Sequence, residues 1–345
     1  MLYPEFSKAL KQKNLGINLV RKALSPAIRY LFFSYYVVTI QKLISAEKPD
    51  RLMVVNGGYP AGDTCRAASI AWGLLKGNRN AIHNFHNMAT PSSWWNTALE
   101  NEIDRLVLNY SAAIISVSRV CAESIQIRPA IKDNPKVTYI YNGIESPTST
   151  ANSLSLRHEL KLSENELICL MLGTYEPRKG HDFLLQAFQQ VIQQVPSARL
   201  VICGDGFPAE ISRVKSLVTQ YCLNQSVFLM GFRKEIHPLL KDADILTVPS
   251  QSFESFGLTS VEAMSCKVPV VATNIGGIPE VVANDDGGYC VQHNDVNGFA
   301  QAMIRLLKDP DLRREQGQKG FERYQKLFTA ERMASEYAAL IRNGV

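Results

Sequence analysis

From residue 52 onward, short apolar runs rich in β-branched residues alternate with longer stretches of helical periodicity. Helix-length segments separate these runs, as parallel β-α-β units require. Runs such as Val268-Pro-Val-Val-Ala272 are apolar at every position, which is typical of strands covered on both faces. The predicted strands are 52–55, 81–85, 113–117, 137–141, 167–172, 200–203, 227–230, 245–248, 268–272 and 289–291. We therefore predict an α/β protein with two doubly wound parallel sheets.

Helical periodicity dominates both ends of the chain and several connections. Leu99, Ile103, Leu106 and Tyr110 form an apolar stripe, and charged residues occupy the opposite face. We expect residues 1–47 to be helical and the tail from about residue 310 to be one uninterrupted helical stretch. The polar segment from Ser146 to Ser153 lacks a hydrophobic period and is the best linker candidate. The expected organisation is a first domain 1–145, a linker 146–153, a second domain 154–325 and a C-terminal helix 326–345 that packs back toward the first domain.

Composition narrows the class of protein. The 345 residues are 46% hydrophobic and 20% charged, which is enough to bury a core in each of two domains. Seven cysteines are scattered without a C-x-x-C pair, so we expect reduced thiols rather than a disulfide framework or a zinc site. No run approaches the roughly 20 apolar residues of a membrane span, and the N-terminus lacks a signal-peptide pattern. These features indicate a cytoplasmic protein.

The positive charge is concentrated at one end. Residues 1–50 contain eight Lys and Arg against three Asp and Glu, whereas the remaining residues are balanced. This region includes an aromatic-rich apolar run from Arg29 to Ile40. We favour a core helix with solvated basic flanks; the alternative is a helix in the interface of an anionic membrane. Nucleic acid is not an expected partner, because no basic stripe continues elsewhere.

Loops that follow the predicted strands carry residue types suited to a phosphorylated ligand. In open parallel sheets, ligands bind beyond the carboxyl ends of the strands. The loop Gly173–Gly180 contains Arg178 and Lys179, a cation pair that suits a phosphate group or is simply solvated. The turn at Cys203-Gly204-Asp205-Gly206 lacks the third glycine of a dinucleotide fingerprint, which argues against an NAD site.

The segment from Pro249 to Met264 is the most informative. A strand ends, a loop follows, and a helix is expected to begin near Gly257 or Leu258, where backbone amides could meet a diphosphate. Glu254 precedes those amides, and Glu262 lies about one turn into the helix. Glu262 has an alternative explanation, because Thr259-x-x-Glu262 matches a capping box.

These motifs, in their order, resemble glycosyltransferase family 4. The resemblance includes Glu254-x7-Glu262, the flanking stretches 243–250 and 269–280, the loop 173–180, and the segments 201–206 and 228–231. It implies a GT-B fold, in which two Rossmann-like domains face a cleft. It also implies a hexosyltransferase that transfers a sugar from a nucleotide-diphosphate donor with retention of configuration and needs no metal or other cofactor.

The resemblance assigns roles by position. His86, in a stretch Asn84-Phe-His-Asn87 like the family's strand-end histidine, would face the transferred sugar, Lys179 would bind the diphosphate, and Glu254 would contact the sugar. Arg178 could help Lys179, Glu262 would bind the ribose, and amides of the helix start would approach the phosphates. Donor binding is thus expected at Gly173, Thr174, Arg178, Lys179, Gly204, Phe256, Gly257, Leu258 and Glu262.

The chain departs from the family pattern in two places. Thr174 stands where the family usually has arginine, and residues 48–55 resemble the middle strand of the family's first domain, so that its opening strands have no counterpart upstream. We also expect no metal site: His83 and His86 would point to opposite faces of a strand, and Asp242-Ala-Asp244 opens a strand at the wrong end for a ligand.

The sequence therefore favours a retaining glycosyltransferase of polysaccharide biosynthesis, with a glycan or lipid-linked glycan as acceptor. The alternatives are a nucleotide-sugar epimerase or hydrolase of the same fold, and a catalytically silent nucleotide-sugar binding module. Peripheral contact with the inner face of an anionic membrane would follow from the basic N-terminal segment.

Overall fold

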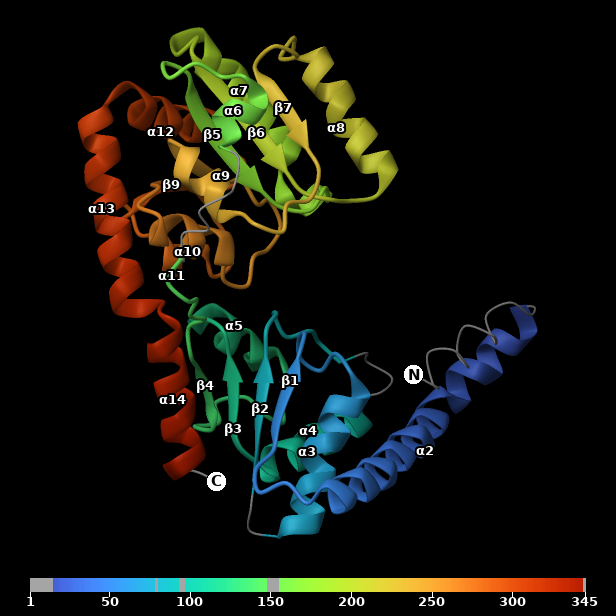
Figure 1. Ribbon diagram of the computed structural model, residues 1–345. Coiled ribbons are helices and arrows are strands. Elements are labelled where there is room, and N and C mark those ends of the chain that lie inside the picture. Colours follow the sequence, from blue (N-terminus) through green and yellow to red (C-terminus); the bar gives the residue numbers. More distant parts are fainter. Residues whose placement is uncertain (1–14, 78–79, 93–96, 148–154, 344–345) are drawn as a thin grey trace. The chain divides into compact units, whose positions relative to one another are not determined.

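The structure, a computed structural model, describes residues 15–77, 80–92, 97–147 and 155–343 (Figure 1). Its contacts divide the chain into two compact units. The first contains residues 1–140 and 335–345, and the second contains residues 141–334. Most of the predicted linker, 146–153, lies outside the described residues.

The first unit has a four-stranded parallel sheet in the order β1-β2-β3-β4. The strands are β1 (Met53–Asn56), β2 (Ala81–Phe85), β3 (Ser111–Ser116) and β4 (Val137–Tyr139). The helices are α2 (Leu15–Glu47), α3 (Asp63–Lys76), α4 (Thr97–Asn109) and α5 (Arg119–Ser124), the last continued by a 3-10 turn, Ile125–Ile127. The strand order runs in one direction, so right-handed crossovers place α3 and α4 on the same face. No strand precedes β1 in the part of the chain that the structure describes, which agrees with the expected absence of the family's opening strands.

Helix α2 confirms the predicted helix for residues 15–47, and residues 1–14 lie outside the described part of the chain. It packs on α3 through a small apolar cluster that includes Ile44 and the fully buried Trp72. The apolar run that starts at Arg29 therefore has a packed side, on which Phe33 and Tyr36 are buried. The same helix also exposes large apolar side chains, among them Leu31, Tyr35 and Val38. The run is therefore part of a packed helix, as favoured; of its basic flanks Lys42 is exposed, whereas Arg29 is bound to Asp63 and Glu100.

The second unit has a six-stranded parallel sheet in the order β10-β9-β8-β5-β6-β7. Its strands are β5 (Leu167–Leu172), β6 (Ala198–Cys203), β7 (Val227–Met230), β8 (Ile245–Val248), β9 (Val270–Asn274) and β10 (Gly288–Gln292). Its helices are α6 (Leu156–Leu160), α7 (His181–Gln194), α8 (Pro208–Gln220), α9 (His237–Asp242), α10 (Leu258–Ser265), α11 (Ile278–Val281), α12 (Val296–Lys308) and α13 (Pro310–Leu327). The strand order reverses between β5 and β8. This reversal is the topological switch point of a doubly wound sheet.

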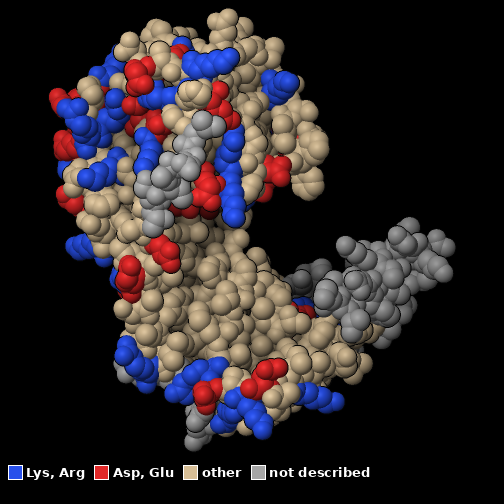
Figure 2. Space-filling model, viewed as in Figure 1, with Lys and Arg blue, Asp and Glu red and all other residues tan. Residues whose placement is uncertain are grey.

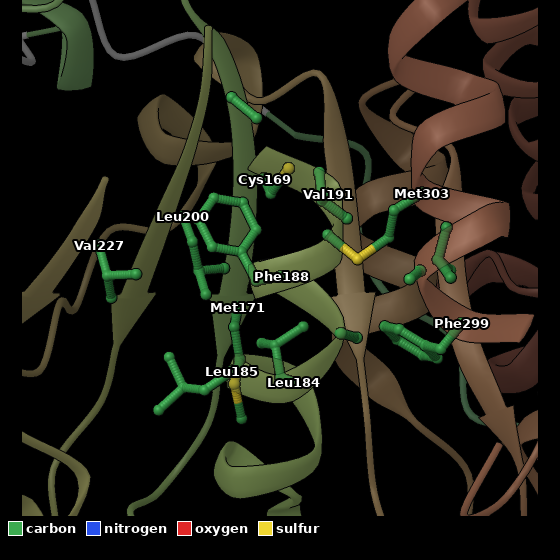
Figure 3. Close-up of a cluster of buried hydrophobic side chains, with 14 of the residues drawn as sticks. Cys169, Met171, Leu184, Leu185, Phe188, Val191, Leu200, Val227, Phe299 and Met303 are labelled. Atoms are coloured by element: carbon green, nitrogen blue, oxygen red, sulfur yellow. The ribbon is translucent and has the colours of Figure 1, made fainter. Parts of the chain in front are cut away.

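The core of the second unit lies between its sheet and two helices. The rings of Phe183 of α7 and Phe299 of α12 lie edge-on with 5.2 Å between their centres, and Leu184, Phe188 and Met303 belong to the same buried cluster (Figure 3). Large apolar side chains of this kind each contribute about 1.5–3 kcal/mol when fully buried. This core holds the strands in place, and the strands in turn position the loops that follow their carboxyl ends.

The helical tail is interrupted, contrary to the prediction. Helix α13 ends at Leu327, and α14 (Ala330–Asn343) begins three residues later. Phe328 is fully buried, and its carbonyl accepts a bond from the Ile144 amide. The Ala330 amide in turn donates to the Ile144 carbonyl. These bonds draw residues 328–329 out of the helix, and apolar periodicity alone cannot reveal such pairing.

Candidate nucleotide-sugar site

A cavity of about 510 Å³ lies at the carboxyl ends of the central strands of the second unit. Its volume is in the range of small-molecule sites. Loops after β5, β6 and β7 and the first turns of α10 form its wall. The predicted site residues that line it are Gly173, Thr174, Arg178, Lys179, Gly204 and Glu262.

The loop after β5 carries the cation pair. A short 3-10 turn, Pro177–Lys179, directs Lys179 over Gly173, so that a Cβ on the glycine would lie 3.7 Å from the lysine Cδ. Arg178 donates through Nε to Glu176 at 2.7 Å. Thr174, which stands where the family usually has arginine, donates its hydroxyl to the same carboxylate. The cations are therefore held at the cavity wall by neighbouring acids.

Glu254 is joined to this loop by an ion pair. Lys179 Nζ lies 2.6 Å from Glu254 Oε2, and Arg178 Nη1 lies 3.7 Å from the same oxygen. Ser250 also donates to that oxygen at 3.3 Å. Lys179 is 20% and Glu254 16% exposed, so both remain accessible to a ligand. The structure thus brings together the lysine and the acid that the sequence placed 75 residues apart.

Gly204 allows the loops after β5 and β6 to lie against each other. A Cβ at Gly204 would be 1.8 Å from the Gly173 carbonyl oxygen, so only glycine fits there. The Gly173 amide donates to the Cys203 carbonyl, and the Tyr175 amide donates to the Asp205 carbonyl. This backbone pairing fixes the floor of the cavity.

Helix α10 begins at Leu258, as predicted. Gly257 precedes it with φ of +91°, a left-handed conformation that favours glycine, and is the N-cap. Because Gly257 occupies the N-cap, Thr259 lies inside the first turn and the capping-box explanation of Glu262 is wrong. The Phe256 ring is 2% exposed and packs on Tyr141 and Phe328, so only its backbone is free to serve a ligand.

Glu262 lines the cavity from α10. Burial raises the pKa of its carboxyl to about 7, because little around it compensates for the lost hydration. A carboxyl in this position can accept hydrogen bonds from ligand hydroxyls once it is ionised.

Residues after β7 also line the cavity, although they were not among the residues expected from the sequence. Phe232 is 71% exposed at its rim, and Arg233 and Lys234 follow. Arg233 pairs with Glu159, whereas Asp205 adds an acid to the opposite loop. A signal was present: these residues directly follow the recognised segment 228–231, at the carboxyl end of a strand next to β6.

His86 lies in the first unit, directly after β2, and is exposed. Neighbouring residues still remove part of its hydration, which lowers the pKa of its imidazole. His83 is the enclosed histidine of this strand: its Nδ1 lies 2.9 Å from the Ser69 hydroxyl, and burial lowers its pKa to about 4. His83 is thus an ordinary buried histidine, whereas the exposed His86 is not.

The Asp242-Ala-Asp244 motif has a structural role. Asp242 accepts from the Ser155 hydroxyl and the Arg157 amide, and Asp244 accepts from the Ile168 amide. Asp244 also pairs with Arg157 and Arg313. Both acids lie at the start of β8, away from the ligand end of the sheet, as the sequence predicted. Among the described residues, no cluster of His, Cys, Asp and Glu could hold a metal ion.

Comparison with known proteins supports this reading of the fold. The sequence model "Glycosyl transferases group 1" matches residues 153–323, and "Glycosyltransferase Family 4" matches residues 1–146. A solved structure of HepE from Anabaena in complex with UDP superposes with a TM-score of 0.74, at 20% identity, over 89% of this chain and 81% of that one. The two parallel-sheet units therefore have the GT-B fold.

Curated relatives agree. The N-acetyl-alpha-D-glucosaminyl L-malate synthase of Bacillus anthracis is 30% identical over 70% of this chain, which spans 62% of that protein's length. The UDP-Gal:alpha-D-GlcNAc-diphosphoundecaprenol alpha-1,3-galactosyltransferase of Escherichia coli is 26% identical, over 88% of this chain and 83% of its own. The two family matches, which together cover both units, show that the chain belongs to the family 4 glycosyltransferases.

Proposed function

We propose that the protein is a retaining glycosyltransferase that moves a sugar from a nucleotide-diphosphate donor to a glycan or lipid-linked glycan. The observation that carries the proposal is the cavity at the β5/β8 switch point. Lys179 and Glu262 both line this cavity, and Glu254 forms an ion pair with Lys179. These residues suit the three parts of a nucleotide sugar: Lys179 the diphosphate, Glu254 the sugar and Glu262 the ribose. The UDP complex of the HepE structure and the names of the curated relatives support the choice of ligand.

The charges of the cavity suit the departure of a nucleoside diphosphate. Cleavage of the bond between the anomeric carbon and the phosphate oxygen leaves negative charge on the diphosphate. Lys179, assisted by Arg178 and by amides at the start of α10, stabilises that charge without a metal in this proposal. Glu254 accepts hydrogen bonds from the sugar and Glu262 from the ribose. His86 of the first unit faces the transferred sugar.

The acceptor is proposed to be held at the inner face of an anionic membrane. No helix among the described residues is long and apolar enough to cross a bilayer. The observation that favours peripheral contact is the exposed stripe of α2, where Leu31 is 69%, Tyr35 55% and Val38 50% exposed. Arg29 does not contribute to such contact, because it is bound to Asp63 and Glu100.

Flotation with liposomes that contain anionic lipid tests the membrane contact. We expect the triple variant Leu31→Ser, Tyr35→Ser, Val38→Ser to lose flotation, because its exposed apolar stripe is gone. Phe207→Ser is the matched control, since Phe207 is 78% exposed in the second unit. Equal flotation of the native chain and the triple variant would refute the contact.

Calorimetric titration with UDP and GDP, followed by product analysis, tests the activity. We expect one diphosphate to bind and a matching sugar donor to yield a glycosylated product that retains the anomeric configuration. Free sugar with and without an acceptor would indicate a hydrolase, and an altered donor sugar an epimerase. Binding without turnover of any donor would indicate a silent binding module.

A further inference from the structure

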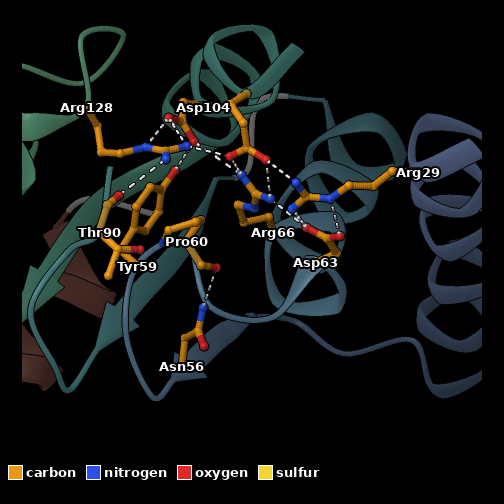
Figure 4. Close-up of polar contacts among 10 residues, drawn as sticks. Arg29, Asn56, Tyr59, Pro60, Asp63, Arg66, Thr90, Asp104 and Arg128 are labelled. Carbon is orange, nitrogen blue, oxygen red and sulfur yellow. Dashed lines mark hydrogen bonds and ion pairs between the residues drawn. The ribbon is translucent and has the colours of Figure 1, made fainter. Parts of the chain in front are cut away.

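A cluster of buried charges lies beneath the loops at the carboxyl end of the first sheet (Figure 4). It joins α2, α3, α4 and the segment after α5. Arg66 is fully buried and pairs with Asp63 at 2.5 Å and with Glu100 at 2.8 Å. The cluster contains three cations and three acids: Arg29, Arg66, Arg128, Asp63, Glu100 and Asp104.

Stability alone does not explain such a cluster. Buried ion pairs rarely stabilise a fold more than apolar residues of the same volume, because the charges lose their hydration. Their best-attested use is to fix one arrangement among several. The residue that the cluster holds in place can be identified from the contacts that its charged side chains make outside the cluster.

The residue held by the cluster is Tyr59, in the loop after β1. Its side chain is 1% exposed, and its hydroxyl donates to Asp104 Oδ1 at 2.8 Å. Asp104 is itself held by Arg128 Nε at 2.8 Å, and the Arg128 guanidinium lies 5.8 Å from the centre of the Tyr59 ring. The ring also packs edge-on against His83 and Phe85 of β2.

The backbone of the Tyr59 loop carries the loop that begins at His86. The His86 amide donates to the Asn56 carbonyl at 3.0 Å, and the Thr90 amide donates to the Tyr59 carbonyl at 2.8 Å. Tyr59 and Ala89 form a parallel bridge between these bonds. The segment from His86 to Thr90 is thus held at both ends by the loop that Tyr59 anchors.

We propose that Tyr59 is a positioning residue: its hydroxyl, bound to an Asp104 that Arg128 holds in place, sets the place of His86 at the end of β2. The role rests on the proposed function, in which His86 faces the transferred sugar. Small displacements of such a group matter, since an error near 1 Å costs up to about 100-fold in rate. Tyr59 itself touches no reacting atom.

The first test follows the imidazole of His86 by NMR in the full chain. The pKa of His86 is lowered by partial burial, so a loosened loop in Tyr59→Phe should raise it toward the ordinary value. Assignment uses His86→Gln among the six histidines. Tyr324→Phe is the matched control, because Tyr324 is also 1% exposed and hydrogen-bonded, but in the second unit. An unchanged His86 titration in Tyr59→Phe would overturn the proposal.

The second test is a double-mutant cycle on transfer from UDP-galactose to a GlcNAc-diphospholipid. If Tyr59 acts through His86, we expect Tyr59→Phe to lower kcat roughly tenfold with little change in the Kd of UDP. We further expect the double variant with His86→Ala to be no slower than His86→Ala alone. Additive losses would contradict the proposal. A native chain that transfers no sugar would refute the proposed function for this pair, while the NMR titration would still decide the role of Tyr59.

Discussion

The two units use charged side chains in opposite ways. In the second unit, Lys179 and Arg178 are 20% and 31% exposed and line an open cavity. In the first unit, Arg66 and Arg128 are at most 1% exposed, and acids surround them. The view in Figure 2 shows charges spread over the second unit, whereas a broad part of the first unit's surface is uncharged. Accessible charges can receive a ligand, while enclosed and balanced charges hold backbone in place.

The largest expected effect is on the stability of the first unit. Arg66→Met should leave three buried or half-buried acids with only two cations, Arg29 and Arg128, and one uncompensated buried charge costs about 3–5 kcal/mol. Denaturant unfolding followed by tryptophan fluorescence measures it, because all three tryptophans (72, 94 and 95) belong to that unit. An unfolding midpoint close to that of the native chain would show that the cluster is dispensable.

The second unit should respond in activity instead. Lys179→Ala is expected to lower kcat about 10²–10³-fold, as for the loss of one group that stabilises charge in the transition state. Turnover of the accepted nucleotide sugar measures it. Lys215→Ala, at an exposed position of α8, is the control. Unchanged turnover in Lys179→Ala would remove Lys179 from its role.

Much of this site could be predicted from the sequence, because its residues follow strands. Strands β5, β7 and β8 match the predicted ranges at both ends. Their buried apolar runs are unambiguous, and the carboxyl ends of parallel strands must meet at one edge. The Lys179–Glu254 pair follows from that geometry once the order of the strands is known. Local motifs and topology coincide here.

The buried charge cluster could not be predicted in the same way. The sequence pattern of α4 shows only that charged residues lie off the apolar stripe, whereas in the structure two of them, Glu100 and Asp104, are 2% and 0% exposed. Their partners come from α2, α3 and the segment after α5, which are far apart in the sequence. A one-dimensional pattern contains no information about such partners. The proposed role of Tyr59 could therefore be found only from the structure.

A smaller effect is expected from pH on donor binding. The pKa of Glu262 is raised to about 7 by burial, so below pH 7 its carboxyl must first lose its proton before the carboxylate can bind a ligand. The affinity for UDP should therefore rise up to tenfold per pH unit toward pH 7 and level off above it. Glu262→Gln should remove this contribution and leave the one due to the phosphates of UDP. Identical pH profiles for the two proteins would show that Glu262 does not bind as its carboxylate.

The smallest effect is expected from an exposed ion pair on the same helix as Glu100 and Asp104. Arg105 pairs with Glu102, and their side chains are 58% and 62% exposed. Water and salt screen such a pair, so Arg105→Met should change the unfolding free energy by only about 0.3–0.5 kcal/mol. The same fluorescence experiment measures it, and about 1 M salt should abolish it because the Debye length falls to roughly 3 Å. The cost of Arg66→Met should persist at that salt concentration, since its acids are enclosed. Two equally salt-sensitive losses would mean that solvent reaches the cluster, and then it could not fix Tyr59.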